Sequence, residues 1–188
     1  MIYTAGMILK IKIMSIGSSE KGLSNDELNR AESVYNVKFP RELRRVLKVL
    51  PRDSGIFYDW GDFSEENVDN LKKIIFENKN YFLENFSEIY WPDSYVAMDL
   101  GKNKEEFKKR LAAAPDLIPL FGSRCMASGI DNGPVFSLVG TDIIYYGENL
   151  NSGIRNEFSS IEWLRRANDI YYEQVKVKVP FWSDMTEI

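Results

Sequence analysis

The part of the chain between residues 116 and 147 constrains the fold more than any other part of the sequence. It contains two apolar runs rich in β-branched and aromatic residues, DLIPLFGSR and GPVFSLVGTDIIYYG, separated by a short polar break. Runs of this composition, bounded by Gly, Asn and Asp, are typical of β-strands joined as a hairpin. The sequence therefore predicts a pair of buried strands.

Helical patterns precede these strands. Ser24 with Glu27 three residues later is typical of a capping box, and it predicts the start of a first helix. A second helix is expected between Pro40, which suits a first helical position, and Pro51, which ends it. Ser64 is expected to cap a third, longer helix. The expected inward residues of the three helices are Leu28, Ala31 and Tyr35, then Leu43, Val46, Leu47 and Leu50, and then Val68, Leu71, Ile75 and Phe82.

The remaining segments complete the predicted fold class. We expect a strand over 95–100, a helix over 103–113, and two further helices over 149–158 and 160–168. Valine and lysine alternate over 175–179, which predicts a half-exposed last strand. Helices cluster early and strands late, so the prediction is a single α+β domain with one curved, mostly antiparallel sheet packed with several helices.

Composition argues against an enzyme. The chain has no histidine, which is the usual general base at neutral pH and the commonest metal ligand. The lone Cys125 has no histidine to activate it and no second cysteine with which to form a disulfide or a metal site. We therefore expect no catalytic residues, no metal site and no cofactor. A single cysteine also fits a reducing compartment, so a cytoplasmic location is expected.

The first 22 residues have a separate pattern. The segment MIYTAGMILKIKIMSIG is apolar, but Lys10 and Lys12 interrupt it and no basic stretch precedes it, so it is a poor secretion signal. No apolar run approaches the roughly 20 residues that span a bilayer, so no membrane partner is expected. We expect residues 1–22 to be an extension or a short strand, and residues 23–188 to form the main domain.

Charge is distributed unevenly along the chain. Residues 53–101 contain eleven acidic residues against three basic ones, a net charge of −8, whereas the whole chain carries −4. Aromatic residues lie within the same stretch, and aromatic anchors ringed by charge are typical of protein interfaces. An ordinary solvated face, with Trp60 as a core residue, is the alternative interpretation. The candidate partner-binding residues are Phe57, Tyr58, Asp59, Trp60, Asp62, Glu65 and Glu66.

Other polar groups suggest weaker hypotheses. The second helix carries a basic outward face, but a net charge of −4 argues against direct binding of nucleic acid. The acids between Asp59 and Glu66 loosely resemble an oxygen-rich cation loop without its ordered motif. Asp142 is expected in a turn between strands, and Arg124 is expected to pair with a carboxylate or with carbonyls, with contact to a partner as the alternative. The basic face consists of Arg41, Arg44, Arg45 and Lys48, with Arg52 nearby.

Four segments follow one another in an informative order. They are GLSNDELNRAESVYNVKFPRELRRVL near the start, Trp60 in a loop, the strands of residues 118–147, and VPFWSD at 179–184. The motif residues in the strands are Ile118-Pro119-Leu120, Arg124, Pro134-Val135-Phe136-Ser137 and Asp142-Ile143-Ile144-Tyr145-Tyr146-Gly147. Together these segments resemble the SUKH superfamily of bacterial immunity and cell-wall-regulator-type proteins. The resemblance implies an exposed loop tryptophan at Trp60 and a closing strand at 179–184.

The resemblance also implies a function. An immunity protein binds a cognate bacterial toxin and blocks it, and the expected target is a nuclease, whose active cleft is positive so that it attracts phosphate. The acidic and aromatic residues would then occlude that cleft, without direct contact to nucleic acid. The alternative is a cytoplasmic regulatory or scaffold module that binds proteins but has no toxin partner. A third hypothesis is a metal-dependent hydrolase that uses the carboxylates between Asp59 and Glu66.

Overall fold

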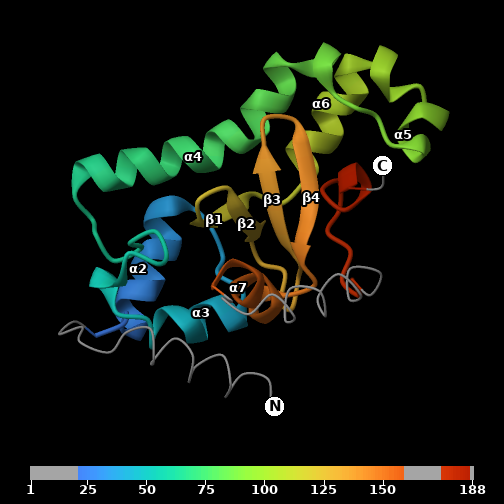
Figure 1. The fold of residues 1–188 in the computed structure, drawn as a ribbon. Helices are drawn as coiled ribbons and strands as arrows, with labels where there is room; N and C mark the ends of the chain where they lie inside the picture. The colour runs from blue at the N-terminus through green and yellow to red at the C-terminus, as the bar shows by residue number, and fades with distance from the viewer. Residues whose placement is uncertain (1–20, 159–174, 187–188) are drawn as a thin grey trace.

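A four-stranded antiparallel sheet lies at the centre of the protein, which is described by a computed structural model over residues 21–158 and 175–186. The strands follow one another in chain order, and helices surround them (Figure 1). The strands are β1 (Leu117–Phe121), β2 (Arg124–Ala127), β3 (Val135–Val139) and β4 (Asp142–Gly147). The α+β prediction is confirmed, but the two predicted runs form two hairpins instead of two strands.

Two-residue turns explain why each run doubles back. Phe121 pairs with Arg124 across the first turn, and Val139 pairs with Asp142 across the second. The first residue of each turn is a glycine with positive φ, Gly122 at 50° and Gly140 at 64°. Glycine adopts this conformation without the clash that a Cβ atom would cause, and so permits the tightest hairpin turn.

The sheet is buried on both faces along β1 and β2. Ile118, Leu120 and Met126 belong to one hydrophobic core. Their neighbours Leu117 and Cys125 belong to a second core on the opposite face. Successive side chains of a strand point to opposite faces, so a strand covered on both sides must be apolar at every position. This explains why all five residues of β1 are buried and why its sequence does not alternate.

The first core is closed by two helices that begin as predicted. Helix α2 (Asn25–Tyr35) has the complete capping box of Ser24 and Glu27. Helix α3 (Arg41–Leu47) starts directly after Pro40, and a 3-10 turn, η1 (Arg52–Ser54), follows Pro51. The predicted inward residues of both helices are buried, namely Leu28, Ala31, Tyr35, Leu43, Val46, Leu47 and Leu50.

Helix α4 (Glu65–Glu84) contributes to both cores. It runs from the part of the molecule that contains α2 to the part that contains α5 and α6 (Figure 1). Ser64 caps it as predicted, and its side chain accepts a hydrogen bond from the backbone of Asn67. Leu71 and Ile75 lie in the first core, whereas Phe82 lies in the second. A single helix therefore ties the two cores together.

The segment after α4 differs from the prediction. Residues 95–100, expected as a strand, fall in the short helix α5 (Asp93–Ala97) and in the start of a 3-10 turn, η3 (Leu100–Lys102). Pro92 directly precedes α5, and Tyr95 and Leu100 turn inward to the second core. Another 3-10 turn, η2 (Phe86–Glu88), connects α4 to this region, and helix α6 (Lys104–Ala113) follows it as predicted.

The end of the chain also corrects two predictions. Helix α7 (Leu150–Phe158) is present as expected, whereas residues 175–179 form no strand. The expected closing strand at 179–184 is instead a turn at 180–183 followed by η5 (Asp184–Thr186). The Ser183 hydroxyl accepts a hydrogen bond from the backbone of Val179, and the Ser183 amide donates back to the Val179 carbonyl. These local bonds replace strand pairing. The expected extension at 1–20 and the expected helix at 160–168 lie outside the described residues, apart from the last two residues of the 1–22 segment.

Gly147 is expected to be intolerant of any side chain. A Cβ atom there would lie 2.5 Å from the backbone nitrogen of Gly153 in α7, and backbone cannot move aside as a side-chain tip can. We expect Gly147→Ala to lower the free energy of unfolding by about 1–3 kcal/mol. Urea unfolding followed by circular dichroism measures this change. Val139→Ala, at a position 65% exposed, is the control and should change stability by less than about 0.5 kcal/mol. Equal stability of Gly147→Ala and the parent protein would contradict the close approach.

Candidate functional site

The loop that contains most of the predicted contacts is built around a buried tryptophan. Trp60 is only 1% exposed. Its ring lies edge-on to Tyr35 of α2 and to Phe39 before α3, with centroids 5.0 Å away in both cases. The expectation of an exposed loop tryptophan is therefore wrong, and the core interpretation of Trp60 holds. Edge-on aromatic pairs add about 0.5–1.5 kcal/mol each beyond area burial, so this side chain anchors the loop.

The two aromatic residues before Trp60 attach the loop to the sheet. Phe57 is 8% exposed and packs edge-on against Phe121 of β1, with centroids 5.1 Å apart. The backbone amide of Tyr58 donates to the carbonyl of Leu120, and its hydroxyl donates to the carbonyl of Gly122. Phe57 is thus a core residue, and only Tyr58 remains half-exposed.

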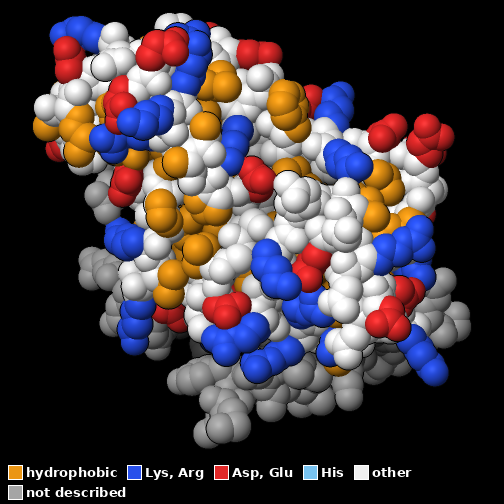
Figure 2. All heavy atoms as spheres, turned by 180° about the vertical axis from the view of Figure 1, so that it is seen from behind, with side chains coloured by type: hydrophobic (Ala, Val, Ile, Leu, Met, Phe, Trp, Pro, Cys, Tyr) orange, Lys and Arg blue, Asp and Glu red, His pale blue; other side chains and the backbone are white. Residues whose placement is uncertain are grey.

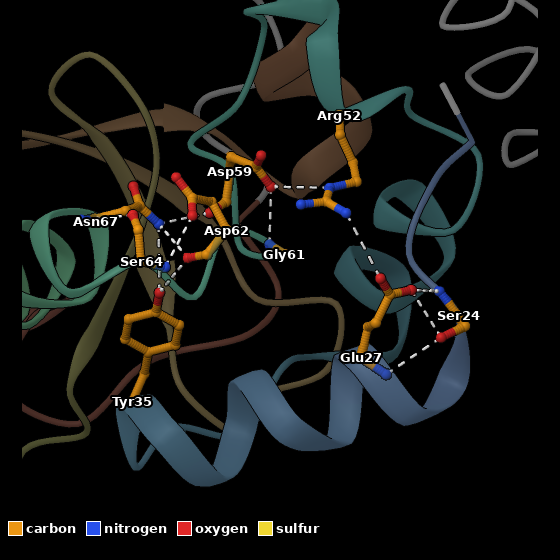
Figure 3. Close-up of polar contacts among 9 residues, drawn as sticks. All are labelled: Ser24, Glu27, Tyr35, Arg52, Asp59, Gly61, Asp62, Ser64 and Asn67. Atoms are coloured by element: carbon orange, nitrogen blue, oxygen red, sulfur yellow. Dashed lines mark hydrogen bonds and ion pairs between the residues drawn. The ribbon is translucent and has the colours of Figure 1, made fainter. Parts of the chain in front are cut away.

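The carboxylate of Asp59 is directed into the protein's own contacts (Figure 3). It accepts a hydrogen bond of 2.8 Å from the amide of Gly61, and it lies 3.5 Å from the guanidinium of Arg52. Arg52 also approaches Glu27, whose carboxylate closes the capping box with Ser24. Hydrogen bonds from the backbone and hydroxyl of Ser24, with Arg52 nearby, hold the pKa of Glu27 below its ordinary value. A chain of polar contacts therefore links the loop to α2.

Asn67 of α4 holds the other end of the loop (Figure 3). Its side-chain amide donates to two backbone carbonyls, that of Asp59 at 2.9 Å and that of Asp62 at 2.7 Å. The Asp62 carboxylate accepts from the backbone of Ser64 at 2.9 Å, and this bond together with the Ser64 hydroxyl lowers the pKa of Asp62. Burial raises the pKa of Tyr35, whose hydroxyl also reaches the Asp62 carbonyl.

Only part of the predicted contact set therefore faces solvent. Glu65 and Glu66 are exposed in the first turn of α4, where their negative charges interact favourably with the positive end of the helix dipole. Asp59 and Asp62 are half-buried and engaged within the loop. The polar groups of the loop bind one another and the backbone of the protein. The loop presents no large exposed apolar side chain.

A different part of the acidic segment combines exposed apolar and acidic side chains. Tyr90 is 70% exposed, Val96 59% and Met98 54%. They flank or belong to α5, on the lobe at the far end of α4 (Figure 1). Glu88, Asp93 and Asp99 are exposed within the same twelve residues. We call this set, Glu88, Tyr90, Asp93, Val96, Met98 and Asp99, the α5 surface.

Buried and half-buried side chains of the same segment attach the α5 surface to the second core. Tyr95 is buried, and its hydroxyl donates to Asp184 at 2.9 Å. Trp91 packs edge-on against Phe86 and Phe107. Sequence reasoning missed this surface because a strand over 95–100 would alternate its side chains between two faces. The signal that could have found it is Pro92, which favours the start of a helix.

The face in Figure 2 carries hydrophobic side chains scattered between charged ones. Scattered exposed apolar residues are ordinary on protein surfaces, whereas several within one short acidic segment are informative. The α5 surface is such a segment.

Two residues of the basic face of α3 pair with carboxylates of the protein itself. Arg41 pairs with Asp131, and Arg44 lies 2.7 Å from Glu32. Burial would raise the pKa of Glu32, but the Phe39 amide together with Arg44 and Lys38 holds it below its ordinary value. These pairs attach α3 to α2 and to the loop after β2, so they account for two of the helix's basic residues.

Arg124 pairs with a carboxylate, as the sequence predicted. Its guanidinium lies 3.8 Å from the ring centre of Tyr146, and its Nε lies 3.4 Å from Glu157. It also donates to the Ser137 hydroxyl at 2.7 Å. Arg124 therefore joins β2, β3, β4 and α7. Asp142 is exposed and begins β4, directly after the turn at Gly140.

Within residues 21–158 and 175–186, no three acidic or cysteine side chains are grouped so that they could hold a metal ion. The carboxylates of Asp59 and Asp62 are bound to backbone amides, and Glu65 and Glu66 face solvent. The cation-loop hypothesis therefore gains no support from their placement. No helix in the described part of the chain is long and apolar enough to cross a membrane.

The comparisons with known proteins add no relative. No protein-family model matches the sequence, and neither the curated proteins nor the solved structures contain a match. The fold and the surface define an α+β domain with an acidic segment, part of which exposes apolar side chains.

Asn67 is expected to stabilise the loop measurably. Asn67→Ala removes the donor from two carbonyls, and an unsatisfied buried polar group costs about 1–3 kcal/mol. Asn70→Ala, on the exposed side of the same helix, is the matched control and should stay within about 0.5 kcal/mol of the parent. Urea unfolding followed by tryptophan fluorescence compares the two variants. Equal effects would contradict the assigned role of Asn67.

Cys125 is expected to be unreactive in the folded protein. Burial raises the pKa of its thiol to about 12, although Arg124 nearby acts in the opposite direction. Because the thiolate is the reactive form, an aromatic disulfide reagent at pH 8 should label the denatured protein and leave the native protein unlabelled over the same time. Rapid labelling without denaturant would show that the thiol is accessible.

Proposed function

We propose that this protein binds a protein partner with a basic surface and blocks it stoichiometrically, as an immunity protein does with a toxin. The observation that carries the proposal is the α5 surface, where Tyr90, Val96 and Met98 are exposed beside acidic residues. Large apolar side chains supply affinity when a partner covers them, and surrounding carboxylates supply orientation and fast association.

The α5 surface is supported by packed side chains of the second core. Tyr95 and Leu100 anchor α5 in the second core, and Phe107 of α6 packs against Trp91. A surface whose backbone is fixed before binding loses less conformational entropy when a partner docks. The α5 surface therefore has the preorganisation that a tight inhibitory interface needs.

The exposed acids at the start of α4 are a secondary part of the proposal. Glu65 and Glu66 lie at the start of α4 and the α5 surface lies beyond its end, and α4 is about 30 Å long, since it has 20 residues and rises roughly 1.5 Å per residue. They lack an exposed large apolar neighbour within the loop before them. Their expected contribution is to attract a basic partner, with little effect on how long it stays bound.

The partner class follows from charge and from the SUKH resemblance. Residues 53–101 carry −8, which complements a positive cleft such as that of a nuclease toxin. The resemblance of the strands and of the opening helices to SUKH immunity proteins points to the same class. Occlusion of the cleft is the mechanism, because it needs no catalytic group in this chain.

The test is affinity capture from an extract of the native host with matched baits. The first variant combines Tyr90→Ser, Val96→Ser and Met98→Ser, and its control combines Val139→Ser and Ile144→Ser, which are exposed apolar positions on the β3–β4 hairpin. We expect the parent and the control to retain one partner at 1:1 ratio. The first variant should bind it about 30-fold more weakly or worse, the loss expected for interface hot spots.

Charge variants separate the two acidic regions. Glu88→Lys with Asp93→Lys should slow association several-fold and flatten its salt dependence, whereas Glu65→Lys with Glu66→Lys should have a smaller effect. If the captured partner contains a toxic domain, co-expression of this protein should restore growth. A partner without toxicity would favour the regulatory or scaffold alternative. If the first variant bound the partner as tightly as the parent protein does, the α5 surface would not be the binding site.

A further inference from the structure

A second surface feature has the opposite charge character. A groove of about 360 Å³ lies between α4 and α6. Its apolar lining includes Ile75, Phe76 and Leu83 from α4 and Leu111 and Ala112 from α6, and Tyr35 of α2 also lines it. We call it the α4–α6 groove. Its volume falls within the range of roughly 300–1,000 Å³ that is usual for small-molecule sites.

The floor of the groove is fixed, while one wall is open. Ile75 is 8% exposed and Leu111 1%, so both belong to packed cores. Phe76, which is 66% exposed, is a large apolar side chain of the groove wall that is left in water. A bound apolar group would cover the Phe76 ring and would remove its apolar surface from water, which favours binding at roughly 25 cal/mol per Å².

Lysines line the same groove. Lys72, Lys79 and Lys108 contribute to the lining, with Asp116 as the acidic residue among the lining side chains. Lys79 is held in position, because its ammonium donates to the Ala114 carbonyl at 2.6 Å and lies 2.7 Å from Asp116. Lys108 contacts Glu105, which is 83% exposed, so water screens this pair strongly. The lining therefore has a positive balance around an apolar floor.

We propose that the α4–α6 groove binds an anionic amphiphile, a small molecule with an apolar body and a carboxylate or similar anionic head. The apolar body lies against Ile75, Phe76 and Leu111, and the head lies among the lysine ammonium groups. The volume of about 360 Å³ suits a small molecule, whereas a stable protein interface covers roughly 800 Å² on each side. The inference is independent of the proposed function, because it uses neither the α5 surface nor a toxin.

Isothermal titration with decanoate tests the proposal on the full chain. Decyltrimethylammonium has the same apolar chain with a cationic head and serves as the ligand control. We expect saturable 1:1 binding of decanoate below its micelle concentration, and binding of the cation at least about tenfold weaker, because the lysines repel it. Equal binding of the two ligands, or no saturable binding of decanoate, would overturn the proposal.

Matched variants locate the site. Ala112→Trp places a large ring in the groove, whereas Ala113→Trp places the same ring at the neighbouring exposed position, which does not line the groove. We expect the first to weaken decanoate binding about tenfold or more and the second to leave it within about twofold. Equal binding by both variants would place the ligand elsewhere and overturn the assignment.

The lysines are tested against a neighbour on the same helix. Lys72→Gln with Lys108→Gln should weaken decanoate binding about two- to fivefold per lysine and leave octyl glucoside binding unchanged, since this ligand has no charge. Lys73→Gln, which removes the same charge from a lysine outside the groove, is the control. Loss of decanoate binding with Lys73→Gln as large as with the pair would show a general charge effect and overturn the role of the groove.

Discussion

Burial of both faces of the small sheet along β1 and β2 is the constraint on which the rest of the structure depends. Two hairpins with two-residue turns give only four short strands, so the sheet cannot form a core unless helices cover each side. α2, α3 and the Trp60 loop cover one face, and α5, α6 and the end of the chain cover the other. The acidic segment is the chain that crosses from the first side to the second, and this crossing determines where its charges emerge.

The sequence predicted local structure well where one residue controls it. The capping box at Ser24, the prolines around α3 and the Ser64 cap each satisfy or remove backbone donors at a helix start, so their effect is independent of tertiary contacts. The strand predictions for residues 95–100 and 175–179 were wrong for the opposite reason. Their apolar patterns fit a strand, but packing against the second core and the bonds between Val179 and Ser183 decided the backbone.

The candidate site was predictable in charge but not in exposure. Counting acids identifies residues 53–101 as the unusual segment, yet composition does not reveal which carboxylates the protein uses itself. Asp59 and Asp62 bind backbone amides within the loop, while Glu88 and Asp93 remain exposed. Trp60 illustrates the same limit, because an indole beside acids can be an interface anchor or a core residue. The rings of Tyr35 and Phe39, more than twenty residues away along the chain, decide between these roles.

The passage of α4 through both cores has a consequence for cooperativity. A protein with two separate hydrophobic clusters can open one of them while the other stays folded, and such openings are visible as regions of low protection in amide hydrogen exchange. Here Leu71 and Phe82 lie on the same helix in different clusters, so opening either cluster removes part of the support of the other. We expect the amides in the middle of α4 to exchange only when the whole fold opens, which makes this helix the reporter of global stability.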